Sequence, residues 1–118
     1  MTLNHTIVPA HDKRASAQFL ARILGLQVQS MSHFEVVKIN PELSLDYDQR
    51  DDFSWHHYAF QVSDQEFEAI FARVRQEGLE FAADPMFERT GEINHRRGGR
   101  GFYFHDPNGH NLEVLTRA

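Results

Sequence analysis

The candidate metal ligands of this chain are two histidines and one carboxylate, each in a different expected strand: His5, His57 and Glu113. Each lies in a short run rich in apolar residues, which is typical of a β-strand. Two imidazoles and one carboxylate that converge form a facial ligand set, which leaves coordination positions open for a substrate. Iron, manganese, nickel, cobalt and zinc all accept these ligands. We therefore expect a small metalloenzyme, provided that the fold brings the three residues together.

Each of the three residues also has a purely structural interpretation. His5 lies close to the amino terminus, where it can be an exposed strand residue, and Glu113 can lie on a solvated sheet face. His57 follows a second histidine, His56, so the ligand is open to misassignment. Alternation along the strand favours His57, because it lies on the face opposite to the apolar Phe60.

Strand alternation also predicts where the candidate ligands point. In the strand over 57–62, the apolar side chains face the helices, and His57 faces the other way. In the strand over 111–116, the apolar residues on either side of Glu113 face the helices, so Glu113 points with His57. A carboxylate in a cavity costs several kcal/mol unless a partner or a metal ion compensates for its burial. A divalent ion between these residues would satisfy all of them.

An internal repeat organises the chain. The first half starts with the strand that carries His5 and reaches a helix-ending Gly25 after 20 positions, and the second runs from His57 to Gly78 in 21 positions. Several short strands follow each helix. The sequence therefore predicts two βαβββ modules within one domain. These modules cover about 1–52 and about 53–118.

Capping residues mark the helix boundaries. Ser63 and Glu66 have the spacing of a capping box, and Asp12 suits the N-cap of the earlier helix. Apolar residues then recur at intervals of three and four, which predicts an amphipathic face packed into the core. The strands expected around these helices cover 3–8, 27–31, 34–39, 43–47, 57–62, 79–82, 101–105 and 111–116.

The repeat identifies a fourth candidate ligand. Leu112–Glu113 in the last strand aligns with Leu45–Asp46 in the last strand of the first module. Asp46 is thereby equivalent to Glu113. Its neighbours favour a solvated position at a loop end over metal ligation; they are Asp48, Arg50, Asp51 and Asp52.

The second module contains an additional loop at about 84–99. The arginines of this segment and its border are Arg89, Arg96, Arg97 and Arg100. Such a run is most often a solvated, flexible loop, and the alternatives are a mobile lid or an anion clamp. The remaining histidines are interpreted mainly as surface or turn residues; they are His11, His33, His95, His105 and His110.

Composition limits the class of protein. With 118 residues, of which 41% are apolar and 25% charged, the chain is long enough for one domain with a core. A net charge of −5 gives no electrostatic support for nucleic-acid binding. No apolar run approaches the length of a membrane span, and no signal peptide is visible. The absence of cysteine excludes disulfides and thiolate metal sites, and it agrees with a cytoplasmic location.

Three segments together resemble the vicinal oxygen chelate superfamily, which includes glyoxalase I, extradiol dioxygenases, fosfomycin-resistance transferases and bleomycin-resistance proteins. They are Leu3–His5, His57–Val62 and Gly101–Glu113, and the last of them is the most specific. The resemblance covers essentially the whole chain. It implies an α+β fold in which paired βαβββ modules form a cupped, partly open mixed sheet with helices on the outer face.

The resemblance also implies a function. His5, His57 and Glu113 match the superfamily's metal ligands. Tyr103 matches a tyrosine that often lines the substrate cavity, and Asp46 matches a fourth carboxylate of glyoxalase I, where glutamate is usual. We therefore expect a homodimeric, divalent-metal-dependent lyase, dioxygenase or transferase that acts on a small oxygen-bearing substrate. Glu113 is a candidate base, and Tyr103 is a candidate hydrogen-bond donor to developing charge.

One alternative belongs to a different class of function. Bleomycin-resistance-like members of the superfamily keep the fold but bind and sequester a small molecule without catalysis. The acidic balance of the chain agrees with a cationic ligand of this kind.

Overall fold

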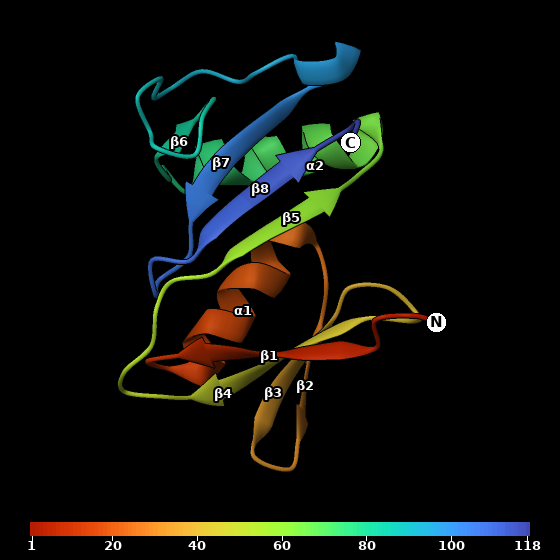
Figure 1. Cartoon of the computed structure of the whole chain (residues 1–118), viewed down its shortest axis with the longest axis vertical. Helices are drawn as coiled ribbons and strands as arrows, with labels where there is room; N and C mark the ends of the chain where they lie inside the picture. Colours follow the sequence, from red (N-terminus) through yellow and green to blue (C-terminus); the bar gives the residue numbers. More distant parts are fainter. The chain divides into compact units, whose positions relative to one another are not determined.

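Residues 1–118 are described by the computed structural model of the protein, and they form two compact units, Met1–Ser54 and Trp55–Ala118. Each unit contains a four-stranded mixed sheet and one long helix (Figure 1). The expected α+β class and the expected βαβββ order of elements in each half are confirmed. Neither helix has the length and apolar character that a membrane-crossing helix requires.

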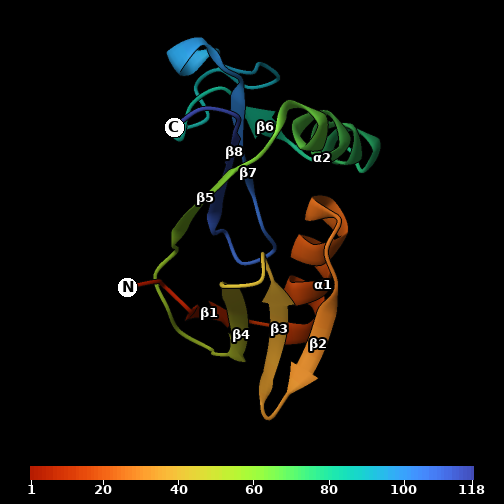
Figure 2. The same cartoon turned by 90° about the vertical axis from the view of Figure 1, so that its right-hand side faces the viewer.

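In the first unit, the strand at the amino terminus lies beside the last strand. The elements are β1 His5–Ala10, α1 Lys13–Leu24, β2 Val28–Met31, β3 Phe34–Lys38 and β4 Ser44–Gln49. Their order across the sheet is β1-β4-β3-β2, with β1 and β4 parallel and the other pairs antiparallel. Helix α1 packs on one face of this sheet, mainly against β3 and β4 (Figure 2). Strand β1 extends through Pro9, which the sheet tolerates because β1 is an edge strand.

The second unit repeats this topology. Its elements are β5 His57–Gln61, α2 Asp64–Gln76, β6 Phe81–Ala82, a 3₁₀ turn at Arg96–Gly98, β7 Gly101–His105 and β8 Asn111–Leu115. The order is β5-β8-β7-β6, with β5 and β8 parallel. Strand β6 is shorter than the expected 79–82. The reason is that the Leu79 N–H still bonds to the Val74 carbonyl at the end of α2 (3.1 Å), so pairing with β7 begins only at Phe81.

The predicted caps fix both helices. The Asp12 side chain accepts from the Ala15 N–H (3.0 Å), and the helix it starts ends at Gly25, whose φ is +75°. Ser63 and Glu66 form the complete capping box, with N–H to oxygen distances of 3.1 and 2.9 Å. These contacts satisfy N–H groups that a helix start otherwise leaves without partners.

An aromatic cluster joins α2 to its sheet. The Phe67 ring meets Phe102 edge-on at 5.4 Å, and Phe71 meets Phe81 at 5.1 Å. Phe102 is fully buried. This packing commits one face of β7 to the helix, so the alternate residues of β7 lie on the opposite face.

The strand register is the same in both units. His5 lies opposite Ser44 and Ile7 opposite Asp46, while His57 lies opposite Asn111 and Ala59 opposite Glu113. Each histidine is therefore placed one diagonal step from the carboxylate of its own sheet. The repeat found in the sequence therefore corresponds to the same strand pairing in both units.

Candidate metal site

Two of the predicted ligands meet in the second unit. His57 begins β5, Glu113 lies in the parallel neighbour β8, and His57 Nε2 lies 3.2 Å from Glu113 Oε1. The carboxylate is largely buried, whereas the imidazole is 43% exposed. The site is thus open to solvent at the histidine and closed behind the glutamate.

The backbone of Asn111 orients the His57 ring. His57 Nδ1 lies 3.1 Å from the Asn111 carbonyl oxygen, which can only accept a hydrogen bond. The ring proton of neutral imidazole therefore belongs on Nδ1, and the lone pair belongs on Nε2. A carbonyl behind the ring is the arrangement typical of histidines that bind metals through Nε2.

The pair fits a divalent ion. In the neutral state of His57, a nitrogen lone pair faces the lone pairs of a carboxylate, an arrangement that a proton or a cation must stabilise. Metal bonds of about 2.1 Å at angles of roughly 90–109° place two ligand atoms about 3.0–3.4 Å apart. The separation of 3.2 Å lies within that range.

The His5 ring in the first unit is oriented in the same way, by an acceptor at Nδ1. Its Nδ1 lies 2.7 Å from Asn4 Oδ1, so the acceptor fixes the proton on Nδ1 and leaves Nε2 available. The ring is exposed. Because His5 belongs to the other unit, the structure sets no distance between it and the His57–Glu113 pair. No group of three or more metal-binding side chains occurs in the structure.

Asp46 lies in β4 and is half-buried. The Ser44 hydroxyl donates to its Oδ1 at 2.8 Å. This serine stands where the second unit has Asn111, so the environment of Asp46 differs from that of Glu113. Asp46 remains a candidate fourth ligand.

Tyr103 lies directly beside the pair. It is opposite Glu113 in the β7–β8 register, and its ring stacks toward His57 at 6.0 Å between centroids. The hydroxyl oxygen accepts from Arg96 Nη1 at 2.7 Å. Burial raises the pKa of Tyr103, the Arg96 hydrogen bond lowers it in part, and the Glu113 charge raises it again. The phenol therefore keeps its proton at neutral pH.

A pocket of about 290 Å³ opens next to this tyrosine. Its wall includes Tyr103, Glu113 and several cationic side chains: Arg96, Arg97, Arg100 and Arg117. Arg96, Arg97 and Arg117 together outweigh the charge of the Glu113 side chain, whereas Arg100 is paired with carboxylates of α2. The pocket is suited to anions.

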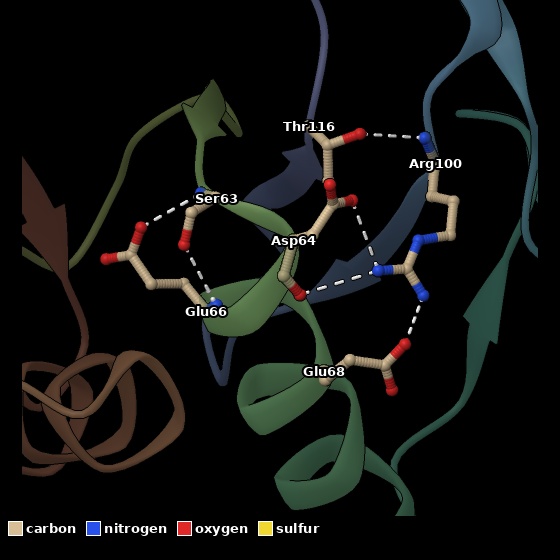
Figure 3. A network of polar contacts seen from close by, with 6 residues as sticks. All are labelled: Ser63, Asp64, Glu66, Glu68, Arg100 and Thr116. Atoms are coloured by element: carbon tan, nitrogen blue, oxygen red, sulfur yellow. Dashed lines mark hydrogen bonds and ion pairs between the residues drawn. The ribbon is translucent and has the colours of Figure 1, made fainter.

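Arg100 is held in a separate structural network. Its guanidinium pairs with Asp64 (3.3 Å) and with Glu68 at the start of α2 (Figure 3). It also covers the Phe67 ring at 4.5 Å. The backbone N–H of Arg100 also donates to the Thr116 hydroxyl at 2.9 Å. Arg89 is paired with Glu92. Of the arginines noted in the loop, Arg96 and Arg97 are thus the ones placed for a ligand.

The loop itself is held by local hydrogen bonds. Asp84 accepts from the N–H groups of Arg89 (2.8 Å) and Glu88 (3.1 Å), and these bonds hold the pKa of Asp84 below its usual value. The Asn94 amide donates to the Ala83 carbonyl at 2.9 Å, and the Asn94 backbone bridges to Gly101. Both ends of the segment are therefore anchored to the sheet.

His110 differs from the sequence interpretation. It lies in the turn before β8, as expected, but it is fully buried and not at the surface. Its Nδ1 accepts from the His56 N–H at 2.8 Å, and His56 Nδ1 contacts the Tyr58 hydroxyl at 2.7 Å. His110 thereby fixes the backbone just before His57. A turn pattern gives no information about burial, so this role was not visible in the sequence.

Comparison with known proteins places the chain in a family. Residues 2–114 match the model of the Glyoxalase/Bleomycin resistance protein/Dioxygenase superfamily, and the chain belongs to this superfamily. The resemblance stated from the motifs is confirmed.

Three relatives are informative. The solved structure of Oxidase ChaP-H2 is 57% identical, with a TM-score of 0.96 over 100% of this chain and 94% of that chain. Oxidase ChaP-H1 is 50% identical, with a TM-score of 0.97 over 100% of this chain and 97% of that chain. The Glutathione transferase FosA of Serratia marcescens is 28% identical over 96% of this chain and 79% of its own length. The superfamily includes enzymes of more than one class.

Proposed function

We propose that this protein is a metal-dependent enzyme that binds one divalent ion through His5, His57 and Glu113 and oxidises a small oxygen-bearing molecule, with dioxygen as the electron acceptor. The observation that carries the proposal is the approach of the His57 Nε2 lone pair to the Glu113 carboxylate at 3.2 Å. The similarity to two structures named as oxidases, at 57% and 50% identity, supports oxidation as the reaction.

His5 supplies the third ligand in this proposal. Its Nε2 is made available by Asn4 in the same way that Asn111 makes His57 Nε2 available. The ligand comes either from the same chain or from a second copy in a homodimer, as the superfamily resemblance implies. Asp46 is not required, because His5, His57 and Glu113 already supply the three protein ligands of a facial set.

Two side chains act on the substrate. A bound divalent ion supplies Lewis-acid polarisation of adjacent substrate oxygens. The Tyr103 hydroxyl is held by Arg96, which donates to the phenol oxygen and leaves the phenol proton free to donate. That proton stabilises negative charge that develops on a substrate oxygen. Glu113 keeps a second oxygen that can accept a substrate proton.

Two other functions of the superfamily receive less support. Sequestration of a cationic drug conflicts with the arginines that line the pocket beside Tyr103. Isomerisation of a glutathione adduct needs a fourth carboxylate, and here that position holds the shorter Asp46. We expect no turnover of the hemithioacetal of methylglyoxal and glutathione. Lactoylglutathione formation at a rate that Glu113→Gln abolishes would replace the oxidase proposal with a glyoxalase.

Metal titration tests the site. We expect untagged apo-protein to bind one Co²⁺ per chain in isothermal titration calorimetry, and His57→Ala or Glu113→Gln to weaken binding by about a hundredfold or more, since each removes a ligand. His33→Ala is the matched control, because His33 is an exposed histidine of the β2–β3 hairpin. Equal affinity in all four proteins, or no binding by the wild type, would refute the proposed site.

A further inference from the structure

Two hydrogen bonds fasten the residue before His57 to the turn and strand that lead to Glu113. Strands β5 and β8 are parallel neighbours, so no tight turn between them sets their register (Figure 1). The Asn111 N–H donates to the His56 carbonyl at 2.8 Å. The His56 N–H donates in turn to His110 Nδ1 at 2.8 Å, across 54 positions of the chain. Both backbone polar groups of His56 are therefore bound to the β8 side of the sheet.

The turn before β8 holds His110 rigidly. Asp106 Oδ1 accepts from the N–H groups of Asn108 (2.8 Å) and His110 (2.9 Å). The Asp106 N–H donates to the His110 carbonyl at 3.1 Å. Asp106 is largely buried and His110 is fully buried. The imidazole thus projects from a backbone that is fixed on both sides.

Side chains from the β5 segment pack around the same imidazole. The His56 ring lies 5.1 Å from the His110 ring, and the Tyr58 ring meets His110 edge-on at 6.1 Å. The Tyr58 hydroxyl contacts His56 Nδ1 at 2.7 Å. Close packing of this kind leaves little room for the ring to shift, so the His110–His56 bond has one geometry.

The first unit shows what the fold needs without a histidine at this place. Ser44 corresponds to Asn111 in the register, and its N–H donates to the Asn4 carbonyl at 3.0 Å. The residue before it is Leu43, whose side chain has no hydrogen-bond acceptor. Asn40 Oδ1 accepts from the Leu43 N–H at 2.9 Å, much as Asp106 accepts from the His110 N–H. The turn and the strand pairing therefore form with a leucine there, and the imidazole acceptor is an addition of the second unit.

This addition stands next to the candidate ligand pair. His57 is the first residue of β5 and its side chain is 43% exposed, and strand ends with exposed side chains open readily. We propose that His110 is a positioning residue, which fixes the His56 backbone and so holds His57 against Glu113 before any ion binds. The cost of ordering the pair is then met during folding and not during metal binding. The inference rests on the proposed function, because it takes His57 and Glu113 as metal ligands.

Amide hydrogen exchange of the metal-free protein, followed by NMR, tests the contact itself. His110→Leu installs the residue of the first unit and removes the acceptor, and His110→Asn places an amide oxygen near the position of Nδ1. We expect roughly tenfold faster exchange at the His56 and Asn111 amides in His110→Leu, and rates close to the wild type in His110→Asn. Val74→Ala is the matched control, because Val74 is a fully buried residue of α2. It lowers overall stability without touching the turn.

Co²⁺ binding tests the consequence for the site. In calorimetry, His110→Leu should bind Co²⁺ about tenfold more weakly than the wild type, because the His57 ring is no longer held in place. The visible absorption bands of bound Co²⁺ should also change, since they report the geometry of the ligands. His110→Asn should restore both the affinity and the spectrum, and Val74→Ala should leave both as in the wild type. A role in stability alone predicts neither the rescue nor the spectral change.

A second variant keeps the test decisive if His110→Leu does not fold. His110→Gln retains a polar side chain of similar size, but its amide reaches the Nε2 position and not the Nδ1 position. It should therefore behave as we expect of His110→Leu, with faster amide exchange and weaker Co²⁺ binding.

The outcomes separate this inference from the proposed function. Unchanged exchange at His56, or unchanged Co²⁺ affinity and spectrum, in both His110→Leu and His110→Gln would overturn the positioning role. A loss of affinity that Val74→Ala reproduces would overturn it as well. A wild type that binds no Co²⁺, yet shows the expected exchange pattern across the variants, would overturn the proposed function and support the fixing of His56 by His110.

Discussion

Two asparagines perform the same task for two histidines. The Asn4 side-chain oxygen fixes the His5 proton, and the Asn111 backbone oxygen fixes the His57 proton. In both cases Nε2 is the nitrogen that is left with a lone pair. Partners of this kind orient a metal ligand and raise its basicity, so they contribute to affinity without touching the ion.

The role of Asn4 can be tested by mutation, because Asn4 contacts His5 through its side chain. Asn111 contacts His57 through its backbone carbonyl, which a substitution leaves in place. Asn4→Ala should weaken Co²⁺ binding by roughly tenfold, because the His5 ring loses its orientation and its preferred tautomer. Asn4→Asp retains an acceptor and should bind nearly as well as the wild type. Calorimetric titration of the two variants measures the difference, and identical affinities would show that Asn4 has no such role.

Tyr58 makes stability sensitive to high pH. Burial, with a smaller contribution from the Asp106 charge, raises the pKa of Tyr58 from 10.0 to about 12. Between these values the unfolded chain loses a proton that the folded chain keeps, so stability present below pH 10 falls as the pH rises toward 12. In Tyr58→Phe this part of the decline should be absent. Urea unfolding at pH 9, 10 and 11 measures it, and parallel curves for both proteins would contradict the assignment.

The sequence was sufficient to predict that two candidate ligands share a sheet face, but not the roles of the residues that support them. Alternation along the strands was sufficient to put His57 and Glu113 on one face, where they meet. The roles of Asn111 and His110 depend on a backbone carbonyl and on burial within a turn, and neither leaves a pattern in the sequence. Arg100 had the same sequence character as Arg96, but contacts with α2 gave it a structural role.

At the scale of elements, capping and periodicity were reliable because both are local. Asp12 and Ser63 cap the helix starts, and Gly25 and Gly78 lie at the helix ends, where expected, since these capping contacts lie within a few residues. Strand ends were less predictable, because they depend on partners far along the chain. Strand β1 reaches Ala10 through its pairing with β4, and β6 is restricted to two residues by the end of α2.

The capping box of α2 should contribute measurably to stability. Ser63→Ala should lower the free energy of unfolding by about 1 kcal/mol, because the Glu66 N–H loses its acceptor. Ser63→Asp keeps an acceptor and should stay close to the wild type. Chemical denaturation of the three proteins tests this, and a Ser63→Ala protein as stable as the wild type would show that the box is dispensable.

At the scale of the whole molecule, the repeat is the organising feature. Each unit presents a histidine and a carboxylate in the same register, and in the second unit the two side chains are in contact, with His57 Nε2 3.2 Å from Glu113 Oε1. The third ligand, His5, belongs to the first unit. The sequence could predict the ligand types, but not which copy of the chain supplies His5, because that depends on how the units assemble.

Mixing two variants that each lack one proposed metal ligand tests whether the site forms within one chain or between two chains. If His5 of one subunit completes the site of another, then His5→Ala and His57→Ala proteins refolded together should recover about one quarter of the tight Co²⁺ sites, because random mixing gives half heterodimers with one intact site each. If the site forms within one chain, no tight sites should return. Calorimetry of the mixture, against each variant alone, decides between them.

The central claim is that one ion binds to His5, His57 and Glu113. The most direct test is an anomalous difference map from crystals of the protein grown with Co²⁺, collected at the cobalt absorption edge. We expect one peak per chain, bonded to Glu113 and to the Nε2 atoms of His57 and of a His5 from the same or a neighbouring chain. A peak at other residues, or no peak in crystals of protein shown to bind Co²⁺, would contradict the account.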